Sequence, residues 1–299
     1  MKKEGTNALI KDFINKSKKL NVAIIGETII DEFVHVNYEG RSMKSNCSVL
    51  NLKNKVQRQV GGAGVIARHL KDFVNSTTLI TNNNNEIVKT RYIDYLNSKK
   101  YIEINKFETE NFKEIEIDTN NYDLVIVADF GHKFCDKLSI NDGFHLMCQT
   151  NSNNFGFNRI SKWKNHRKKS VTIDKREGAL QCNKKLSFKN KKDIINLFNY
   201  EMNAESLFVT LGENGSVMTD GNKVFAQSCY KTNIVDTIGA GDTFFSFASL
   251  ANTIYGNDSN VMVIPSLAAA LSTTWLCNDK NVTIKRLIEF NNQINTNEN

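Results

Sequence analysis

Short apolar runs rich in β-branched residues recur along the first two thirds of this 299-residue chain. Polar turns bound each run, and most runs are separated from the next by enough residues to form a helix. Such runs suit the strands of a parallel sheet, because helices cover both of its faces and bury every side chain. The sequence therefore predicts an α/β body with a mainly parallel central sheet. The predicted strands are residues 22–25, 77–81, 124–128, 145–148, 170–173 and 207–211.

Two segments, residues 32–60 and 90–117, contain alternating apolar and polar residues, for example at residues 101–104 and 115–117. Alternation with a period of two suits an antiparallel strand that exposes one face to solvent. We expect these segments to form a small β lid, inserted twice into a single domain that spans residues 1–299. Helices are predicted at residues 1–20, 65–73, 243–253, 265–276 and 284–292.

The composition argues against several classes of protein. Apolar residues make up 40% of the chain and charged residues 24%, as in globular proteins. No stretch reaches the roughly 20 apolar residues that span a bilayer, and the lysine-rich start lacks the apolar core of a signal peptide. We therefore expect a cytoplasmic protein without membrane contact. The net charge of +7 comes partly from residues 162–169 and 184–192, which lie outside any nucleic-acid-binding motif, so we expect no nucleic acid partner.

The sequence Asp-Thr-Ile-Gly-Ala-Gly-Asp at residues 236–242 joins a strand-like stretch to an apolar helical run. A glycine turn that leads into a helix leaves backbone N–H groups unpaired and pointing at one place, where the helix dipole also favours an anion. Gly239 and Gly241 let the backbone approach a phosphate closely. Asp242 is then either a general base beside that phosphate or the N-cap of the helix, and the spacing alone leaves both interpretations open.

This glycine turn resembles the C-terminal signature of the ribokinase-type, or PfkB, carbohydrate kinases, and the resemblance extends over nearly the whole chain. It implies a ribokinase-like three-layer α/β/α sandwich with a β lid. It also implies an enzyme that uses ATP and Mg²⁺ to phosphorylate a hydroxyl of a sugar or sugar phosphate. By the same resemblance Asp242 is the catalytic base, and the backbone N–H groups of Gly239, Ala240 and Gly241 form the anion hole.

The resemblance also assigns the sugar site. Asp31 stands where the family has its substrate-binding aspartate, and a short carboxylate just past a strand end can accept hydrogen bonds from two hydroxyls. Gly61 and Gly62 resemble the family's substrate loop at the start of a helix. The asparagine that the family usually places three residues after the second glycine is Val65 here. A capping role for Asp31 and a packing turn at the glycines are the alternatives.

Two further segments resemble the nucleotide site of the family. Residues 174–177 resemble its Asn-x-x-Glu motif with Asp in place of Asn, and residues 209–216 resemble the strand and turn that line the nucleotide. The residues expected to bind ATP are Thr210, Gly212, Gly215, Thr237 and Asp174, and Glu177 is expected to bind Mg²⁺ through water. A solvated charged turn and an ordinary β-hairpin turn are the alternatives.

Two further segments resemble particular branches of the family. They are the lid segment with Arg41 and Lys44 and the Asn-rich residues 149–158. They are similar to the heptose-7-phosphate kinase branch and to PfkB domains found beside nucleotidyltransferases in surface-polysaccharide pathways. Arginine and lysine are the usual phosphate ligands, so these two side chains are expected to bind a phosphate that the acceptor already carries. A heptose-phosphate-like acceptor is therefore favoured.

Two other functions stay open at this point. Because Val65 and Asp174 depart from the family pattern, one alternative is a non-catalytic sugar- or nucleotide-binding module that acts with a nucleotidyltransferase. The other alternative is a nucleoside kinase on the same fold. Lid strands with exposed edges need some cover, so we also expect a homodimer that pairs through the lid.

Overall fold

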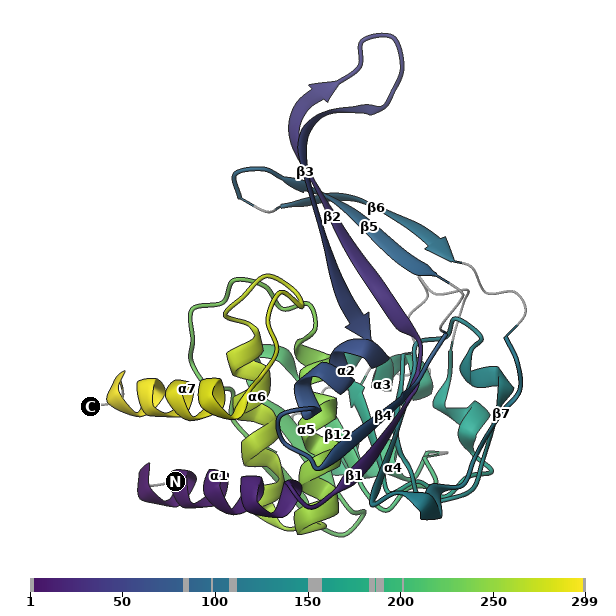
Figure 1. The fold of residues 1–299 in the computed structure, drawn as a ribbon, viewed down its shortest axis with the longest axis vertical. Helices are drawn as coiled ribbons and strands as arrows, with labels where there is room; N and C mark the ends of the chain where they lie inside the picture. The colour runs from purple at the N-terminus through teal and green to yellow at the C-terminus, as the bar shows by residue number, and fades with distance from the viewer. Residues whose placement is uncertain are drawn as a thin grey trace.

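An eight-stranded sheet forms the centre of the computed structural model, which describes residues 3–82, 86–97, 99–107, 112–149, 158–182, 186, 191–200 and 202–297 (Figure 1). The strands are β1 (Asn21–Gly26), β4 (Ser76–Ile80), β8 (Leu124–Asp129), β10 (His145–Cys148), β11 (Ser170–Asp174), β12 (Leu207–Thr210), β13 (Ser216–Thr219) and β14 (Val224–Gln227). Their spatial order is β14-β13-β12-β11-β10-β8-β1-β4. The strands from β12 to β4 run parallel, and β13 and β14 add an antiparallel edge. The predicted parallel α/β sheet is therefore confirmed.

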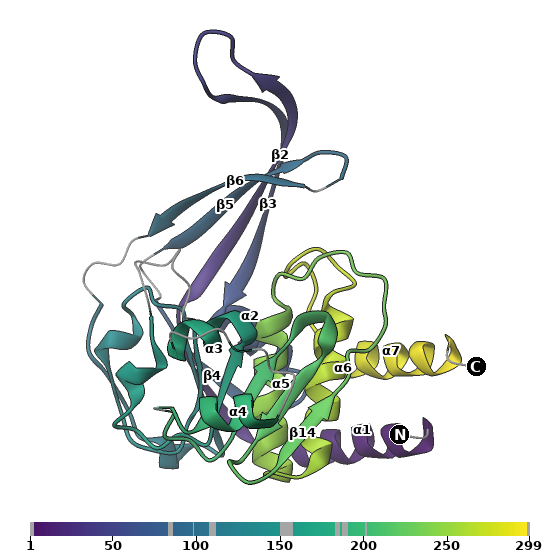
Figure 2. The same cartoon turned by 180° about the vertical axis from the view of Figure 1, so that it is seen from behind.

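Helices cover both faces of this sheet. They are α1 (Lys3–Ser17), α2 (Ala63–Leu70), α3 (Lys175–Cys182), α4 (Lys191–Phe198), α5 (Ala240–Tyr255), α6 (Val263–Ser272) and α7 (Ile284–Asn297). Successive side chains of a strand point to opposite faces. In β1, Val22 and Ile24 pack into the core formed with α1, α2, α5, α6 and α7, whereas Ala23 and Ile25 pack into the core formed with α3 and α4. Figures 1 and 2 show the two helical layers from opposite sides. Together with the sheet between them they confirm the predicted three-layer fold.

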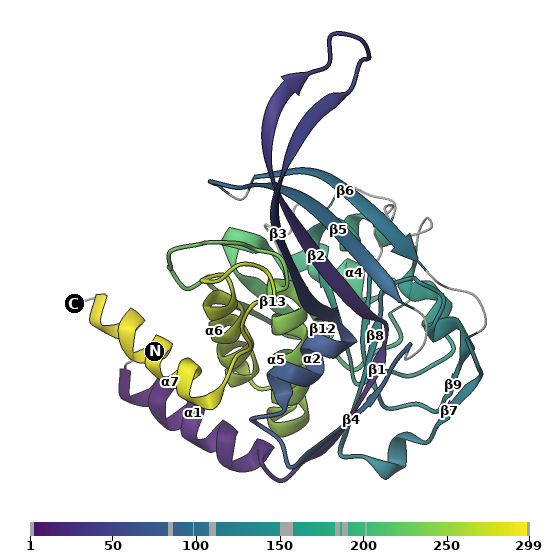
Figure 3. The same ribbon diagram turned by 45° about the horizontal axis from the view of Figure 1, so that its top comes forward.

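The helices after residue 242 are confirmed, and α5 is the most deeply placed of them. Every residue of α5 from Thr243 to Ala251 is buried, because the helix lies between the sheet and helices α1, α2 and α6. At the outer surface, α1 and α7 lie side by side and bring the two ends of the chain close together (Figure 3). None of the described helices is long and apolar enough to cross a lipid bilayer.

A separate four-stranded sheet stands above the body as a lid (Figures 1 and 3). Its strands are β2 (Thr28–Arg41), β3 (Ser48–Gly62), β5 (Ile87–Asp94) and β6 (Lys100–Phe107), in the order β3-β2-β5-β6. Strand β2 follows β1, and β5 follows β4, so both hairpins leave the body at the carboxyl edge of the main sheet. The first strands of the two hairpins therefore run in the same direction and pair in parallel.

The lid differs from the sequence prediction in two respects. The alternating pattern predicted antiparallel strands only, but the central pair β2 and β5 is parallel, because both hairpins start from the same edge. Segment 90–117 was expected to stay in the lid, but β7 (Ile115–Ile117) pairs with β9 (Leu138–Ile140) in a two-stranded sheet. The apolar side chains of that pair pack against the core on the α3 and α4 side, which draws the segment back to the body.

The remaining regular structure is short. Turns of 3₁₀ helix occupy Thr119–Asn121, Cys135–Lys137, Ile160–Trp163, Gly212–Asn214 and Ser259–Met262. Most of the Asn-rich residues 149–158 and much of the basic run 184–192 lie outside the described residues.

Candidate active site

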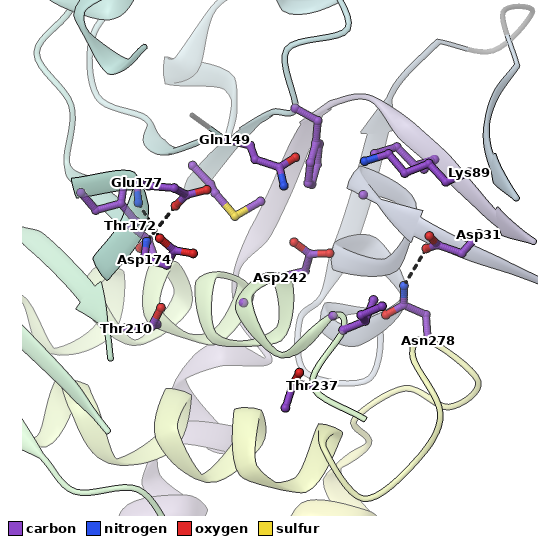
Figure 4. Close-up of a pocket in the computed structure, with 18 of the residues that line it drawn as sticks. Asp31, Lys89, Gln149, Thr172, Asp174, Glu177, Thr210, Thr237, Asp242 and Asn278 are labelled. Atoms are coloured by element: carbon purple, nitrogen blue, oxygen red, sulfur yellow. Dashed lines mark hydrogen bonds between the residues drawn. The ribbon is translucent and has the colours of Figure 1, made fainter. Parts of the chain in front are cut away.

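A cavity of about 450 Å³ lies between the carboxyl edge of the main sheet, the start of α5 and the lid (Figure 4). Four parallel strands end at it, and they contribute Phe130, Gln149, Asp174 and Thr210. Open α/β sheets bind ligands outside the carboxyl ends of their strands, where side chains from several strands meet. The cavity is therefore the candidate active site.

The start of α5 offers an anion-binding turn. Gly239 is the N-cap and has a φ of 83°, a left-handed conformation that favours glycine. A side chain there would also collide with Asn278, whose Oδ1 atom would lie 2.3 Å from the added Cβ. The N–H of Ala240 donates weakly to the carbonyl of Thr237 at 3.3 Å, whereas within the described chain the N–H groups of Gly239 and Gly241 have no acceptor. These free N–H groups at a helix start can bind a phosphate.

Asp242 faces the cavity from the first turn of α5 (Figure 4). The capping interpretation is wrong, because Gly239 is the N-cap and no side chain caps this helix. Within the described chain, the carboxyl group of Asp242 forms no hydrogen bond or ion pair. Burial and, to a lesser extent, the charge of Asp31 raise its pKa to about 7, with the charge of Lys89 opposing them. Near neutral pH this carboxylate can accept a proton.

The side of the cavity under the lid carries the predicted sugar ligand. Asp31 is buried and lines the cavity, but it already forms an ion pair with Arg91. Its second oxygen accepts a hydrogen bond from Asn278 Nδ2 at 3.3 Å. Gly62 lines the cavity, and Gly61 packs so closely that an added Cβ would lie 2.5 Å from Asp31 Oδ2. The structure thus brings Asp31 and both glycines together at one end of the cavity.

Three residues singled out from the sequence lie elsewhere. Val65 is fully buried in the core and does not line the cavity. Arg41 and Lys44 lie at the exposed tip of the β2–β3 hairpin, far above the body (Figure 1), and Arg41 binds Asn46 there at 3.2 Å. The expected contact of Arg41 and Lys44 with the acceptor is therefore not made, because β2 is 14 residues long and carries its end past the cavity.

The opposite side of the cavity carries Asp174 and Glu177 (Figure 4). Each accepts a hydrogen bond from the backbone of the other, Asp174 Oδ1 from Glu177 N at 2.6 Å and Glu177 Oε2 from Asp174 N at 2.8 Å. This is a capping box at the start of α3, and it fixes both side chains. Burial, with smaller contributions from the charges of Asp174 and Asp242, raises the pKa of Glu177 to about 8, and the hydrogen bond from Asp174 N opposes the rise.

These carboxylates suit Mg²⁺, which prefers oxygen ligands and usually keeps several of its waters. A group of three possible ligand atoms within 4.8 Å of one another lies elsewhere in the described chain, on Glu27, Asp129 and Cys135. That group is held by protein donors, including Phe130 N to Glu27 at 2.9 Å and Lys162 Nζ to Asp129 at 2.7 Å. It therefore supports the loop after β8 and leaves no ligand free for a metal.

The other predicted nucleotide residues divide into two groups. Thr210 and Thr237 line the cavity on either side of the start of α5. Gly212 and Gly215 lie in the turn between β12 and β13, where Leu211 N bonds to Gly215 O at 2.8 Å, and neither lines the cavity. They form a hairpin turn, as the alternative interpretation expected.

A buried chain of hydrogen bonds joins α2 to the start of α5. Val282 N donates to His69 Nδ1 at 3.0 Å, so the ring proton is on Nε2, which lies 3.0 Å from Thr243 Oγ1. Thr243 Oγ1 donates to the carbonyl of Gly239 at 2.9 Å. Burial lowers the pKa of His69 to about 3, so the ring stays neutral. These hydrogen bonds fix the position of the glycine turn relative to α2.

Several polar side chains that line the cavity were not assigned to the site from the sequence, among them Lys89, Arg91, Glu103, Gln149 and Asn278. The alternation in β5 was a usable signal for Lys89, since Lys89 and Arg91 are two residues apart and share a face. Asn278 lies in the connection between α6 and α7, 247 residues from Asp31, and no local pattern marks it.

Comparison with known proteins agrees with this geometry. Residues 170–257, which include the start of α5, match the pfkB family carbohydrate kinase model. A segment of 43 residues is 44% identical to fructoselysine 6-kinase from Escherichia coli (strain K12), but the match covers 14% of this chain and 16% of that relative.

Solved structures match over nearly the whole chain. The ribokinase from Thermotoga maritima matches with a TM-score of 0.64 and 15% identity, over 91% of this chain and 99% of that one. The nucleoside kinase from Methanocaldococcus jannaschii matches with a TM-score of 0.63 and 15% identity, over 93% and 99%. The Arabidopsis thaliana ribokinase, solved with ribose and ATP, matches with a TM-score of 0.63 and 14% identity, over 91% and 99%. The chain therefore has the ribokinase-like fold, and residues 170–257 are similar to pfkB family carbohydrate kinases.

The raised pKa of Asp242 predicts a pH-dependent gain from its removal. A carboxyl group whose pKa rises from 3.8 to about 7 on folding costs stability once it is ionised, fully above pH 7 and not below 3.8. We expect Asp242→Asn to raise Tm at pH 8 by at least ~2 °C, and the gain to shrink as the pH falls toward 4. Calorimetry at both pH values measures this, with the exposed Glu116→Gln as the matched control. A lower Tm for Asp242→Asn at pH 8 would contradict the assignment.

Proposed function

We propose that this protein is an ATP-dependent kinase that transfers the γ-phosphate to a hydroxyl of a sugar or sugar phosphate. The observation that carries the proposal is the start of α5, where Asp242 faces the cavity beside the free N–H groups of Gly239 and Gly241. A proton acceptor and an anion site side by side are the two features that phosphoryl transfer requires of a protein. The protein would act in the cytoplasm, on a small molecule rather than on nucleic acid.

In this mechanism the acceptor hydroxyl lies between Asp31 and Asp242. The Asp242 carboxylate takes the hydroxyl proton as the oxygen bonds to the γ-phosphorus, and the bond from that phosphorus to the bridging oxygen of ADP breaks. The N–H groups of the glycine turn hold the charge of the transferred phosphoryl group. Glu177 would hold Mg²⁺ through water, and that ion would neutralise the phosphates. The lid covers the acceptor and keeps water from competing for the phosphoryl group.

The acceptor class is a further part of the proposal. A heptose-phosphate-like acceptor remains our preferred substrate, although Arg41 and Lys44 are too far from the cavity to select it. The alternative acceptor is a nucleoside, and the similarity to the M. jannaschii nucleoside kinase supports it. A non-catalytic module is less well supported, because Val65 is a core residue and Asp174 is a helix cap, so neither departure removes a group from the reacting centre. An ADP-release screen over sugars, heptose and hexose phosphates and nucleosides separates these candidates.

We further propose that the protein forms a homodimer through the lid. The edge strands β3 and β6 expose apolar side chains, among them Leu52, Val56 and Ile104. Pairing of such edges with a second copy would cover them. Light scattering is expected to give twice the 33.9 kDa mass of the chain, and Val56→Lys is expected to return it to the monomer mass. A wild-type monomer at micromolar concentration would refute this.

The most direct mutational prediction concerns Asp242. Asp242→Asn keeps the shape of the side chain but removes the proton acceptor, so we expect kcat to fall by roughly 10²–10⁴-fold while ATP binding is retained. An ADP-release assay measures turnover, and isothermal titration with ATP–Mg²⁺ measures binding. Glu116→Gln serves as the matched control and should behave like the wild type. Near-normal turnover by Asp242→Asn would end the proposal.

The pKa of Asp242 also predicts the pH profile of the reaction. Because its carboxyl group is protonated below about pH 7, kcat/KM should fall about tenfold per pH unit on the acid side and level off above it. The measurement uses saturating ATP–Mg²⁺, since a bound cation keeps Glu177 ionised. A flat profile between pH 5.5 and 8 would show that another group accepts the proton.

A further inference from the structure

The face of the lid that covers the cavity carries two cations, Lys89 and Arg91, both on β5. Lys89 is the register partner of Asp31 in β2, and Arg91 is the register partner of Glu103 in β6. Residues two apart on a strand share a face, so these four side chains lie together on one face of the lid. All four line the cavity.

Arg91 pairs directly with both carboxylates of this group. Its Nη1 forms an ion pair with Asp31, and its Nε donates to Glu103 Oε2 at 2.8 Å. Only 10% of the Arg91 side chain is exposed, and the Asp31 oxygen that it leaves free accepts from Asn278. Each carboxylate therefore has a hydrogen-bonded cationic partner other than Lys89.

Lys89 is the cation that remains. Across the described ranges, its ammonium group donates no hydrogen bond and forms no ion pair. Burial lowers its pKa and the charge of Arg91 adds to that effect, while the charges of Glu103, Asp31 and Asp242 oppose it. A partly buried charge without a partner is unfavourable, and an anion brought by a ligand would relieve that cost.

The position of Lys89 indicates which ligand would supply the anion. Figure 4 shows Lys89 and Asp31 on one side of Asp242, and Glu177 and Thr210 on the other. The side with Glu177 and Thr210 is the proposed nucleotide side. An anion at Lys89 would therefore belong to the acceptor.

We propose that Lys89 binds an anionic group of the acceptor, a phosphate or a carboxylate, so that the substrate is a charged sugar derivative rather than a neutral sugar. The proposal rests on the proposed function only in treating the Asp31 side as the acceptor side. Lys89, which faces the cavity, takes the anion-binding role that the sequence analysis assigned to Arg41 and Lys44. A neutral sugar would leave the Lys89 ammonium group unpaired and would bind more weakly.

Binding of matched neutral and charged sugars tests this inference. The probes are fructose with fructose 6-phosphate and galactose with galacturonate, titrated calorimetrically in the presence of ADP–Mg²⁺. The wild type is expected to bind the charged member of one pair at least about tenfold more tightly, as a charge-assisted hydrogen bond predicts. The pair that shows this preference identifies the group as phosphate or carboxylate. Lys89→Met should lose the preference, and Lys89→Arg should keep part of it.

The matched control is Lys55→Met, which removes an exposed lysine from lid strand β3 and should keep the wild-type preference. Equal affinity of the wild type for both members of each pair, or no binding of either, overturns the inference. So does a preference that survives in Lys89→Met, or a Lys89→Met variant that weakens only ATP binding. A protein that prefers the charged sugar but never releases ADP would refute the proposed kinase activity and leave the Lys89 site standing.

Discussion

The burial of helix α5 is the constraint on which the candidate site depends. Its middle residues are enclosed by the sheet and by other helices, so only its first turn opens toward the cavity. Gly239 starts that turn in a left-handed conformation, and the N–H groups of Gly239 and Gly241 are left without acceptors in the described chain. Asp242 follows with a carboxyl group that no described partner neutralises. The hydrophobic core thus fixes an anion site and a proton acceptor at the edge of the sheet.

The lid adds positive charge at this edge, where the charged residues that the described body contributes to the cavity are all acidic. Both lid hairpins arise where parallel strands of the body end, which places the charged face of β5 opposite the first turn of α5. Lys100 at the start of β6 binds Asp236 at 3.1 Å, in the loop that leads into the same turn. The same loop and helix therefore contact the lid and would contact the nucleotide, so lid position and phosphate binding are expected to influence each other.

The sequence predicted those features that depend on local pattern. Apolar runs report burial on both faces, so the parallel strands were predicted, and the glycine turn before an apolar helix indicated the start of α5. Features that depend on register were not predictable. The pairing of Asp31 with Arg91 and Asn278 joins three distant segments, and the length of β2, which carries Arg41 and Lys44 away from the cavity, is set by pairing with β3. Alternation suggested lid strands but could not show that residues 115–117 join the body.

The structure of the protein with a non-hydrolysable ATP analogue and Mg²⁺ tests the central claim most directly, because it locates the phosphate that would be transferred. The account predicts γ-phosphate oxygens about 3 Å from the N–H groups of Gly239 and Gly241, with the nucleotide extending toward Thr210 and with Asp242 facing the phosphorus. Phosphates bound beside Asp31 and Lys89, or away from the first turn of α5, would contradict it.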